Sequence, residues 1–320
     1  MKPVSSSRGR GIFLINSIEE VEYGEAFVIQ KYVANPLLIH RHKFDLRLYV
    51  LVTCFNPLEA WLYQEGFARF CSVPYSSDKE DMHDKFVHLT NSSVQQALFK
   101  DPEFALPDSL RPLISNDPLL SLTGGSKRSL RFLQSKLEDY DINWDALWQK
   151  IRKVVLAALF SAQSKIPFQP NSFELFGFDV MIDENLKVWL LEVNASPSLG
   201  IQTPLDQVVK KEMICDVLNI VDPSPYDREA LLEVVQRKIT EMSKSGPGAK
   251  TRGHHGAPGR SSAASSDPKQ LNLDIKDILC GLRPRQYGEL PSKLGKFERI
   301  APSLEFNQFS RMKQAPGRRK

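Results

Sequence analysis

The segment from residue 176 to 194, FGFDVMIDENLKVWLLEVN, constrains the fold more than any other part of the chain. It contains two apolar runs of strand length on either side of the turn-forming pair Glu184-Asn185. If that pair makes a two-residue turn, Asp183 pairs with Leu186 and the two runs become antiparallel strands. The pattern therefore predicts a β-hairpin.

The register of this hairpin predicts where its few polar residues lie. A two-residue turn places Asp179 opposite Leu190, so that Glu192 is a diagonal neighbour of Asp179 on the same face. Asn194 follows two residues later on that face. Two acids and one amide are therefore expected to converge at one end of an otherwise apolar hairpin.

This polar cluster has two interpretations. Carboxylates are costly to bury without a charge partner, and a hard cation would offset that cost. A ligand set of oxygen atoms alone, from Asp179, Glu192 and Asn194, suits Mg²⁺ or Mn²⁺ completed by water and phosphate oxygens. The alternative is an exposed hairpin end where the acids are only solvated.

Two further runs are rich in β-branched and aromatic residues, and they indicate strands at Phe27–Val33 and Phe44–Phe55. The second run alternates, so that every other residue from Phe44 to Val52 faces the core. The opposite face begins with three charged residues, which are Lys43, Asp45 and Arg47. A turn at residues 56–59 then leads into the next strand, so the framework is antiparallel.

Three segments have the pattern of helices. The first is long and amphipathic, starts at Asn143 and stops before Pro167. The others begin at Thr203-Pro204 and Ser224-Pro225, each with a cap, a proline at the first position and an acid two residues later. An α+β fold follows. Lys210 and Lys211, within the second of these helices, are expected on an exposed face rather than at a substrate.

The start of the chain combines small residues, glycines and cations. Lys2 precedes Ser7, Arg8, Gly9, Arg10 and Gly11, and such a loop lets backbone N–H groups approach a phosphate chain. A basic N-terminus with no ligand is the alternative interpretation. A further polar group, Arg69 with His88-Leu89-Thr90-Asn91, reads either as part of a site or as an ordinary loop.

Charge divides the chain into two parts. Residues 243–320 carry 16 Lys and Arg against 6 Asp and Glu, a net charge of +10, whereas residues 1–242 carry 26 against 32, a net charge of −6. Residues 243–266 are rich in Gly, Pro and Ser and indicate a flexible linker. We therefore expect a folded domain over 1–242 and a basic, mostly disordered tail over 243–320, with a short docking helix at 271–282. The tail is either simply solvated or an arm for a polyanion.

The composition and the chain pattern argue against several classes of protein. The chain is 42% hydrophobic, and its longest apolar stretch, residues 154–160, is far shorter than the ~20 residues that span a bilayer. The N-terminus lacks the apolar core of a signal peptide, and the four scattered cysteines suit a reduced intracellular compartment. Nucleic-acid binding is disfavoured, because the part before the tail is acidic and offers no basic face with stacking residues.

Six motifs in order resemble the tubulin-tyrosine-ligase-like family of ATP-grasp amino-acid ligases, and among them its tubulin polyglutamylases. The resemblance runs from Lys2 to about Val221. The motifs are Lys2-Pro3 with SRGRGI, Gln30-Lys31-Tyr32, Lys43 to Arg47, His88 to Asn91, Phe178-Asp179, and LLEVNASPSL.

The resemblance implies an ATP-dependent ligase that adds free glutamate to glutamate side chains in the acidic tails of tubulin. It implies a location in the cytoplasm at the cytoskeleton, including cilia or flagella, with microtubules as partner. It also implies roles for single residues. Arg47, Arg69 and Lys43 would be catalytic, and Asp179, Glu192 and Asn194 would hold Mg²⁺ or Mn²⁺. The nucleotide would contact Lys2, Ser7, Arg8, Gly9, Arg10, Gly11, Gln30, Lys31, Tyr32, Asp45, Thr90 and Asn91.

The chain departs from the family pattern at its start. In such ligases an N-terminal domain precedes the Lys-Pro position, which here is Lys2-Pro3. We therefore expect an ATP-grasp fold without its N-terminal domain. Two other functions stay open: a microtubule-binding pseudo-enzyme without turnover, and a ligase that uses glycine or another acidic acceptor protein.

Overall fold

A computed structural model describes most of the chain as two units. The first comprises Met1–Val221 with Ser292–Lys320, and the second comprises Asp222–Pro291. The described residues are 1–4, 9–21, 24, 26–98, 107–122, 124–167, 169, 172–223, 228–244, 273, 275, 278 and 285–314.

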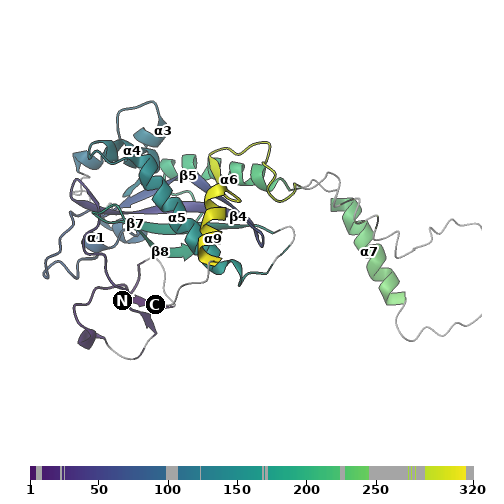
Figure 1. Ribbon diagram of the computed structural model, residues 1–320, viewed down its shortest axis with the longest axis horizontal. Coiled ribbons are helices and arrows are strands. Elements are labelled where there is room, and N and C mark those ends of the chain that lie inside the picture. Colours follow the sequence, from purple (N-terminus) through teal and green to yellow (C-terminus); the bar gives the residue numbers. More distant parts are fainter. Residues whose placement is uncertain are drawn as a thin grey trace, which may run out of the picture. The chain divides into compact units, whose positions relative to one another are not determined.

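An antiparallel sheet forms the centre of the first unit (Figure 1). Its two long strands, β4 (His42–Phe55) and β5 (Leu58–Phe70), pair along most of their length. The order along the sheet is β6 (Lys127–Ser129), β5, β4, β7 (Glu174–Ile182) and β8 (Val188–Asn194). Together with the helices this confirms the expected α+β class.

The remaining strands and the helices complete the first unit. Its other strands are β1 (Lys2–Pro3), β2 (Phe27–Val28), β3 (Leu38–Ile39) and β9 (Phe297–Ala301). Its short helices are η1 (Ile18–Glu20), α1 (Lys85–His88), α2 (Ser92–Gln95), η3 (Asp108–Leu110) and α3 (Pro118–Ser121). The longer helices are α4 (Leu130–Glu138), α5 (Trp144–Gln163), α6 (Pro204–Val221) and α9 (Leu304–Gln314).

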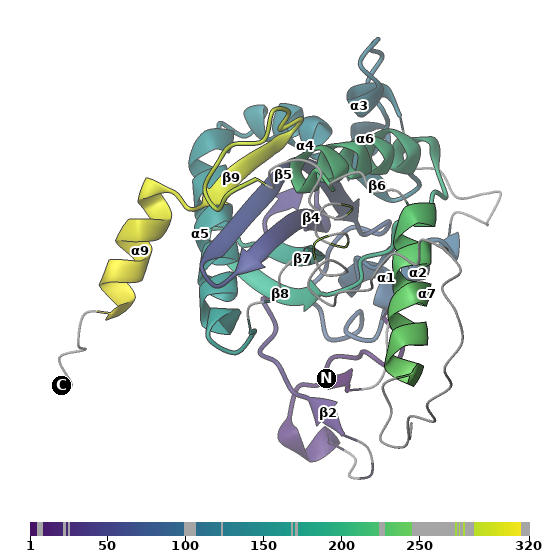
Figure 2. The same cartoon turned by 90° about the vertical axis from the view of Figure 1, so that its right-hand side faces the viewer.

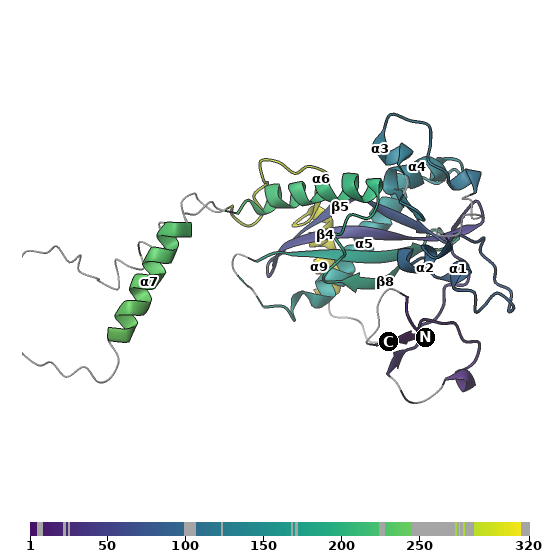
Figure 3. The same cartoon turned by 180° about the vertical axis from the view of Figure 1, so that it is seen from behind.

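The alternation in β4 divides two hydrophobic clusters between the faces of the sheet. Leu46, Leu48 and Val50 point to the face that α4 and α5 cover. Tyr49 and Leu51 point to the opposite face, where α6 runs along the sheet (Figure 3). The second face is therefore apolar under α6 and charged only near the start of β4, which leaves one end of the sheet for polar chemistry.

The expected helix starts are confirmed where the structure describes them. Asn143 caps α5, since its side chain accepts the backbone N–H of Ala146 at 2.9 Å. Thr203 precedes α6 and accepts the N–H of Asp206 at 3.2 Å. The second unit contains α7 (Arg228–Lys244). Its expected start at residues 224–227, the linker after residue 244 and most of the expected 271–282 helix lie outside the described residues.

The predicted hairpin exists, but its predicted register is wrong. The turn has three residues, because the N–H of Asp183 bonds to the carbonyl of Lys187 at 3.0 Å and Leu186 adopts a left-handed φ of 55°. A bulge then shifts the pairing, so that Asp179 lies directly opposite Glu192. A non-glycine residue in the left-handed region and a bulge leave no mark in the hydrophobic pattern.

The expected long strand over Phe27–Val33 is also shorter than predicted. Only Phe27 and Val28 form β2, paired with β1. Residues 29–33 run on without strand pairing, although they have the composition of a strand.

Ordered structure also returns after residue 242, contrary to the predicted boundary. Strand β9 pairs with residues 60–63 of β5 and lies beside it in Figure 2. Phe297 is 3% exposed and packs against Tyr63, with ring centroids 4.8 Å apart and ring planes tilted by 52°. The prediction of a disordered tail rested on the high net charge of residues 243–320. Many Lys and Arg residues surround this short strand, so that charge gave no sign of it.

No helix in the described ranges is both long enough and apolar enough to span a bilayer.

Glu65 is a buried acid on β5 without a cation as hydrogen-bond partner among the described residues. Its carboxylate accepts the backbone N–H groups of Gly66 at 3.3 Å and of Leu130, the first residue of α4, at 3.2 Å. Burial raises the pKa of Glu65 from 4.5 to about 7, against these hydrogen bonds, which lower it.

We expect Phe297→Ala to lower the free energy of unfolding by about 3 kcal/mol or more, because it leaves a cavity where the buried ring at the start of β9 packs against β5. Urea unfolding followed by circular dichroism measures this. Leu304→Ala, at a side chain 83% exposed in α9, is the matched control and should change little. Equal losses in both variants would contradict the role of β9.

We expect Glu65→Gln to remove a pH dependence of stability. The folded state keeps a proton on Glu65 that the unfolded chain releases above about pH 4.5, so stability falls as pH rises from there to about 7. The variant should therefore gain up to about 3 kcal/mol over wild type between about pH 5 and about pH 8. A constant difference across that range, measured by urea unfolding, would contradict the raised pKa.

Candidate functional site

One face of the sheet carries a row of charged side chains near the start of β4, and α6 contacts this row at its β6 end. The row crosses five strands because the strand registers place its members opposite one another. From β6 to β8 the members are Lys127, Arg69, Asp45, Arg47, Asp179 and Glu192.

Arg69 is the centre of this row. Its guanidinium donates to Asp45 at 2.7 and 2.5 Å, and to Asp179 at 2.8 Å. Burial disfavours the charge, but the two carboxylates outweigh burial and raise the pKa of Arg69 further. One cation therefore ties together three strands, β4, β5 and β7.

Asp179 has a second cation, Arg47. The Arg47 guanidinium donates to the two oxygens of Asp179 at 2.5 and 3.1 Å, a bidentate pair. Burial would raise the pKa of Asp179, but Arg69 and Arg47 overcome it and lower that pKa to about 2. Asp179 is therefore ionised at any physiological pH.

Glu192 lies beside Asp179 and has no cation of its own within ion-pair distance in the described chain. Glu192 is exposed to solvent at the edge of the sheet, but partial desolvation and then the neighbouring Asp179 raise its pKa. The amide of Asn194 donates to Glu192 at 3.2 Å. The structure thus brings together the two acids and the amide that the sequence singled out. No third acid, His or Cys joins them among the described residues.

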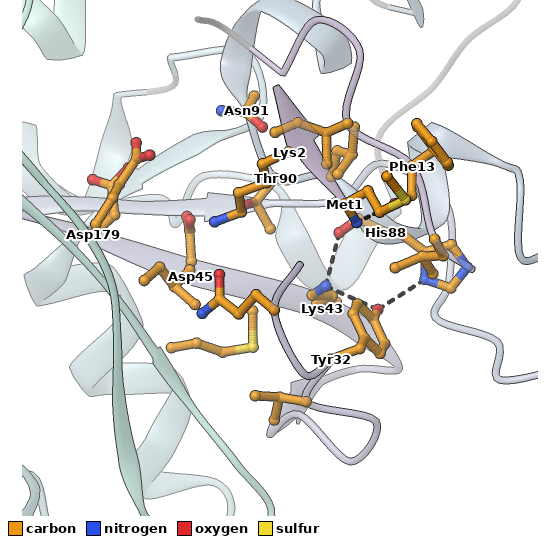
Figure 4. A pocket seen from close by; sticks show the side chains of 18 of the residues that line it. Met1, Lys2, Phe13, Tyr32, Lys43, Asp45, His88, Thr90, Asn91 and Asp179 are labelled. Atoms are coloured by element: carbon orange, nitrogen blue, oxygen red, sulfur yellow. Dashed lines mark hydrogen bonds between the residues drawn. The ribbon is translucent and has the colours of Figure 1, made fainter. Parts of the chain in front are cut away.

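A cavity opens beside this row, between the N-terminal segment and the sheet (Figure 4). Most of the residues expected at the nucleotide line it, namely Lys2, Gln30, Lys31, Tyr32, Asp45, Thr90 and Asn91. Two residues expected to be catalytic, Lys43 and Arg69, and two expected to hold the cation, Asp179 and Glu192, line it as well. Arg47 and Asn194 lie outside the lining, in contact with Asp179 and Glu192.

Lys43 is fixed at the side of the cavity. Its ammonium donates to the hydroxyl of Tyr32 at 3.0 Å and to the carbonyl of His88 at 2.7 Å, as Figure 4 shows. The Tyr32 hydroxyl also bonds to the ring of His88 at 2.9 Å. Burial lowers the pKa of Lys43, more than the nearby Cys71 and Asp45 raise it. Lys43 is therefore a desolvated cation held in one position.

The glycine loop does not line the cavity, although the sequence predicted that it would contact the nucleotide. Gly9, Arg10 and Gly11 are not part of the cavity lining, and Ser7 and Arg8 lie outside the described residues. Gly9 has a φ of 76°, and an added Cβ would come within 2.9 Å of Val94 and 3.0 Å of the Asn91 side chain. This glycine therefore lets the loop pack closely against Asn91, which does line the cavity.

Sequence reasoning missed two kinds of residue. The first is apolar lining such as Phe13, Met181 and Leu191. Met181 could have been found, since it lies two residues after Asp179 on the same face of a strand. The second is His88, whose ring positions Tyr32. Its motif was noted, but nothing in the sequence signals that contact.

Lys210 also differs from the expectation. It is 7% exposed and bonds to Asp206, whereas Lys211, the next residue in α6, is exposed as predicted. Lys210 therefore belongs to the buried face of α6 that covers the sheet.

The chain is similar to several known proteins. The model of the tubulin-tyrosine ligase family matches residues 1–105 and 115–230. The human protein named tubulin polyglutamylase TTLL5 is 39% identical over 69% of this chain and 17% of its own length. Human TTLL2, named a probable tubulin polyglutamylase, is 37% identical over 69% of this chain and 34% of its own.

A third relative matches nearly the whole chain. The human protein named tubulin monoglutamylase TTLL4 is 35% identical over 99% of this chain and 27% of its own length. The chain thus spans about a third or less of the length of these relatives. The family match covers most of the first unit, including every member of the charged row. The chain therefore belongs to the tubulin-tyrosine ligase family.

Proposed function

We propose that the chain carries the site of an ATP-dependent ligase that adds glutamate to glutamate side chains in the acidic tails of tubulin. One observation carries this proposal: an acid pair, Asp179 and Glu192, lies beside two guanidiniums at the edge of a cavity. That arrangement suits a phosphate chain with a divalent cation. The printed names of the relatives support tubulin as the acceptor.

The cavity has the groups that a nucleotide needs. Gln30, Lys31 and Tyr32 are proposed to contact the adenine, and Asp45 to accept from a ribose hydroxyl. Lys2 is proposed to meet the phosphates with its positive charge. Thr90 and Asn91 complete the lining with small polar groups. These roles follow the resemblance, and the shared cavity supports them.

The residues present fit a divalent cation, Mg²⁺ or Mn²⁺. Partial desolvation raises the pKa of Glu192, and the neighbouring charge of Asp179 raises it further. A proton or a cation removes that repulsion. Glu192, Asp179 and the amide oxygen of Asn194 would hold the ion, which would neutralise charge on the phosphates. Asp179 would then share its oxygens between the ion and the guanidiniums of Arg47 and Arg69.

The reaction needs positioned charge more than it needs a protein nucleophile. A carboxylate oxygen of the acceptor would attack the γ-phosphorus of ATP, and the bond to ADP would break to leave an acylphosphate. The amine of free glutamate would then attack the acyl carbon and lose a proton as phosphate departs, leaving an amide bond. Arg47 and Arg69 would bind the oxygens that carry this charge, and Lys43 would add a fixed cation at the cavity.

Partners and location follow from the same proposal. The acidic tails of tubulin would meet the basic residues of 243–320, whose net charge is +10. The names of the relatives favour the cytoplasm at the cytoskeleton, and the resemblance adds cilia or flagella. Free glutamate is the proposed second substrate.

We expect Glu192→Gln to lower tubulin-dependent and glutamate-dependent ADP formation about 100-fold or more, because one charge of the acid pair is lost while its shape is kept. Glu174→Gln, at an exposed position on the same hairpin's first strand, is the matched control and should keep full activity. Both variants should unfold near the temperature of the wild type. Turnover of the Glu192 variant at the wild-type rate would contradict the proposal that Glu192 binds the cation.

A further inference from the structure

The ring of His88, the last residue of α1, lies between the cavity and the loop that precedes α1. Its Nδ1 atom is 2.9 Å from the hydroxyl of Tyr32, and its Nε2 atom is 3.0 Å from the backbone carbonyl of Asp81. The rings of Tyr32 and Tyr75 meet it edge-on, with centroids at 5.7 and 5.8 Å. His88 is 6% exposed, so the ring is buried and held at both of its nitrogens.

These contacts determine which atom donates in each hydrogen bond. The carbonyl of Asp81 can only accept, so Nε2 of His88 carries the proton. In a neutral ring Nδ1 is then an acceptor, and the hydroxyl of Tyr32 donates to it. The Tyr32 oxygen keeps its lone pairs for the ammonium of Lys43, which donates to it at 3.0 Å. One directed chain of hydrogen bonds therefore runs from Lys43 through Tyr32 and His88 to Asp81 (Figure 4).

His88 contributes to both hydrogen bonds that hold the ammonium of Lys43. The ring orients the hydroxyl of Tyr32, and the backbone carbonyl of His88 accepts from Lys43 directly at 2.7 Å. An ammonium has three N–H donors, and Lys43 uses two of them on the described residues. Because Lys43 lines the cavity, its third N–H is left for a ligand there.

The arrangement requires a neutral His88. Burial lowers the pKa of His88 from its usual 6.5, and Lys43 lowers it further, against Asp81 and Asp84, which raise it. Asp78 and Lys79 line a second cavity together with His88. The pKa values of the Tyr32 and Tyr75 hydroxyls are raised, so both stay protonated in this range. The ring is therefore neutral near pH 7.

Protonation of His88 would break the chain at one point. A charged imidazole carries an N–H on both nitrogens, so Nδ1 could no longer accept from Tyr32. The Tyr32 hydroxyl would have to turn, and a second positive charge would lie beside the desolvated ammonium of Lys43.

We propose that His88 is a positioning residue for the nucleotide: its neutral ring orients the Tyr32 hydroxyl, which holds the Lys43 ammonium with one N–H left for the ligand. This rests on the proposed function, in which Tyr32 contacts the adenine and Lys43 is a fixed cation at the cavity. Acidification that protonates His88 therefore weakens nucleotide binding.

The first test needs no nucleotide. The full chain with ¹⁵N-labelled histidine is studied by NMR at about pH 7.5, and the signals of His88 are identified by their loss in His88→Asn. We expect a neutral ring with its proton on Nε2 and a pKa below 6.5. A proton on Nδ1, or a charged ring at this pH, would overturn the proposal.

The second test measures binding of a non-hydrolysable ATP analogue with Mg²⁺ by calorimetry at about pH 7.5. We expect His88→Phe to weaken binding about fivefold or more, because it fills the space but removes the acceptor for Tyr32. His88→Asn should stay within about twofold of wild type, since its amide oxygen can replace Nδ1 as acceptor. His83→Asn, at an exposed histidine of the same loop, is the matched control and should bind like wild type.

The pH profile separates positioning from packing. Between about pH 7.5 and pH 5, wild type should lose about threefold more affinity than His88→Asn, because only wild type gains a charge beside Lys43. His83→Asn should follow wild type at both values. The titration of the nucleotide itself is common to all three proteins and cancels in this comparison.

The remaining outcomes are distinct. Equal binding by wild type and His88→Phe at both pH values would overturn the proposal. So would equal losses in His88→Phe and His88→Asn with lowered unfolding temperatures, which would show a purely structural role. A wild type that binds no nucleotide would overturn this proposal and the proposed function together. The expected binding pattern without any ligation would contradict only the proposed function.

Discussion

Arg69 lies inside the first unit and donates to carboxylates on two neighbouring elements, Asp45 on β4 and Asp179 on β7. A buried guanidinium needs such partners, since removing it from water without them would be costly. Asp179 in turn needs Arg47 and Arg69 to stay ionised in the same setting. The network is thus mutually dependent, and it holds the ends of three strands in the register that the cavity requires.

The two faces of the sheet differ in polarity, and this difference supports the network. One face is apolar from Phe44 to Val52 of β4 and packs on α4 and α5. The other is apolar only beneath α6 and polar beyond it. The polar end also has a direction, from the acid pair on β7 and β8 to Lys127 on β6.

Much of this could be predicted from local patterns. The alternation in β4 and the caps of α5 and α6 are local signals, and the structure follows them. The register of the hairpin could not be predicted, because nothing in the sequence indicates that Leu186 adopts a left-handed conformation. The acids still meet, because the bulge on β8 between Leu190 and Glu192 compensates for the longer turn and restores Glu192 to the face of Asp179.

Other features depended on contacts between distant parts of the chain. The burial of Lys210 is hidden beside the exposed Lys211, although Asp206 four residues earlier was a usable signal for an ion pair. Strand β9 depends on β5, some 235 residues earlier, and its Lys-rich surroundings resemble a tail. The position of His88 at Tyr32 likewise exists only once the chain is folded.

The central claim is that this charged row serves an ATP-dependent glutamate ligase acting on tubulin. The most direct test is intact-mass analysis of tubulin tails after incubation of microtubules with the full chain, Mg²⁺, ATP and either glutamate or glycine. The account predicts glutamyl-sized additions that need both ATP and glutamate, and none with glycine. Unmodified tails, in a preparation that a known glutamylase modifies, would contradict it.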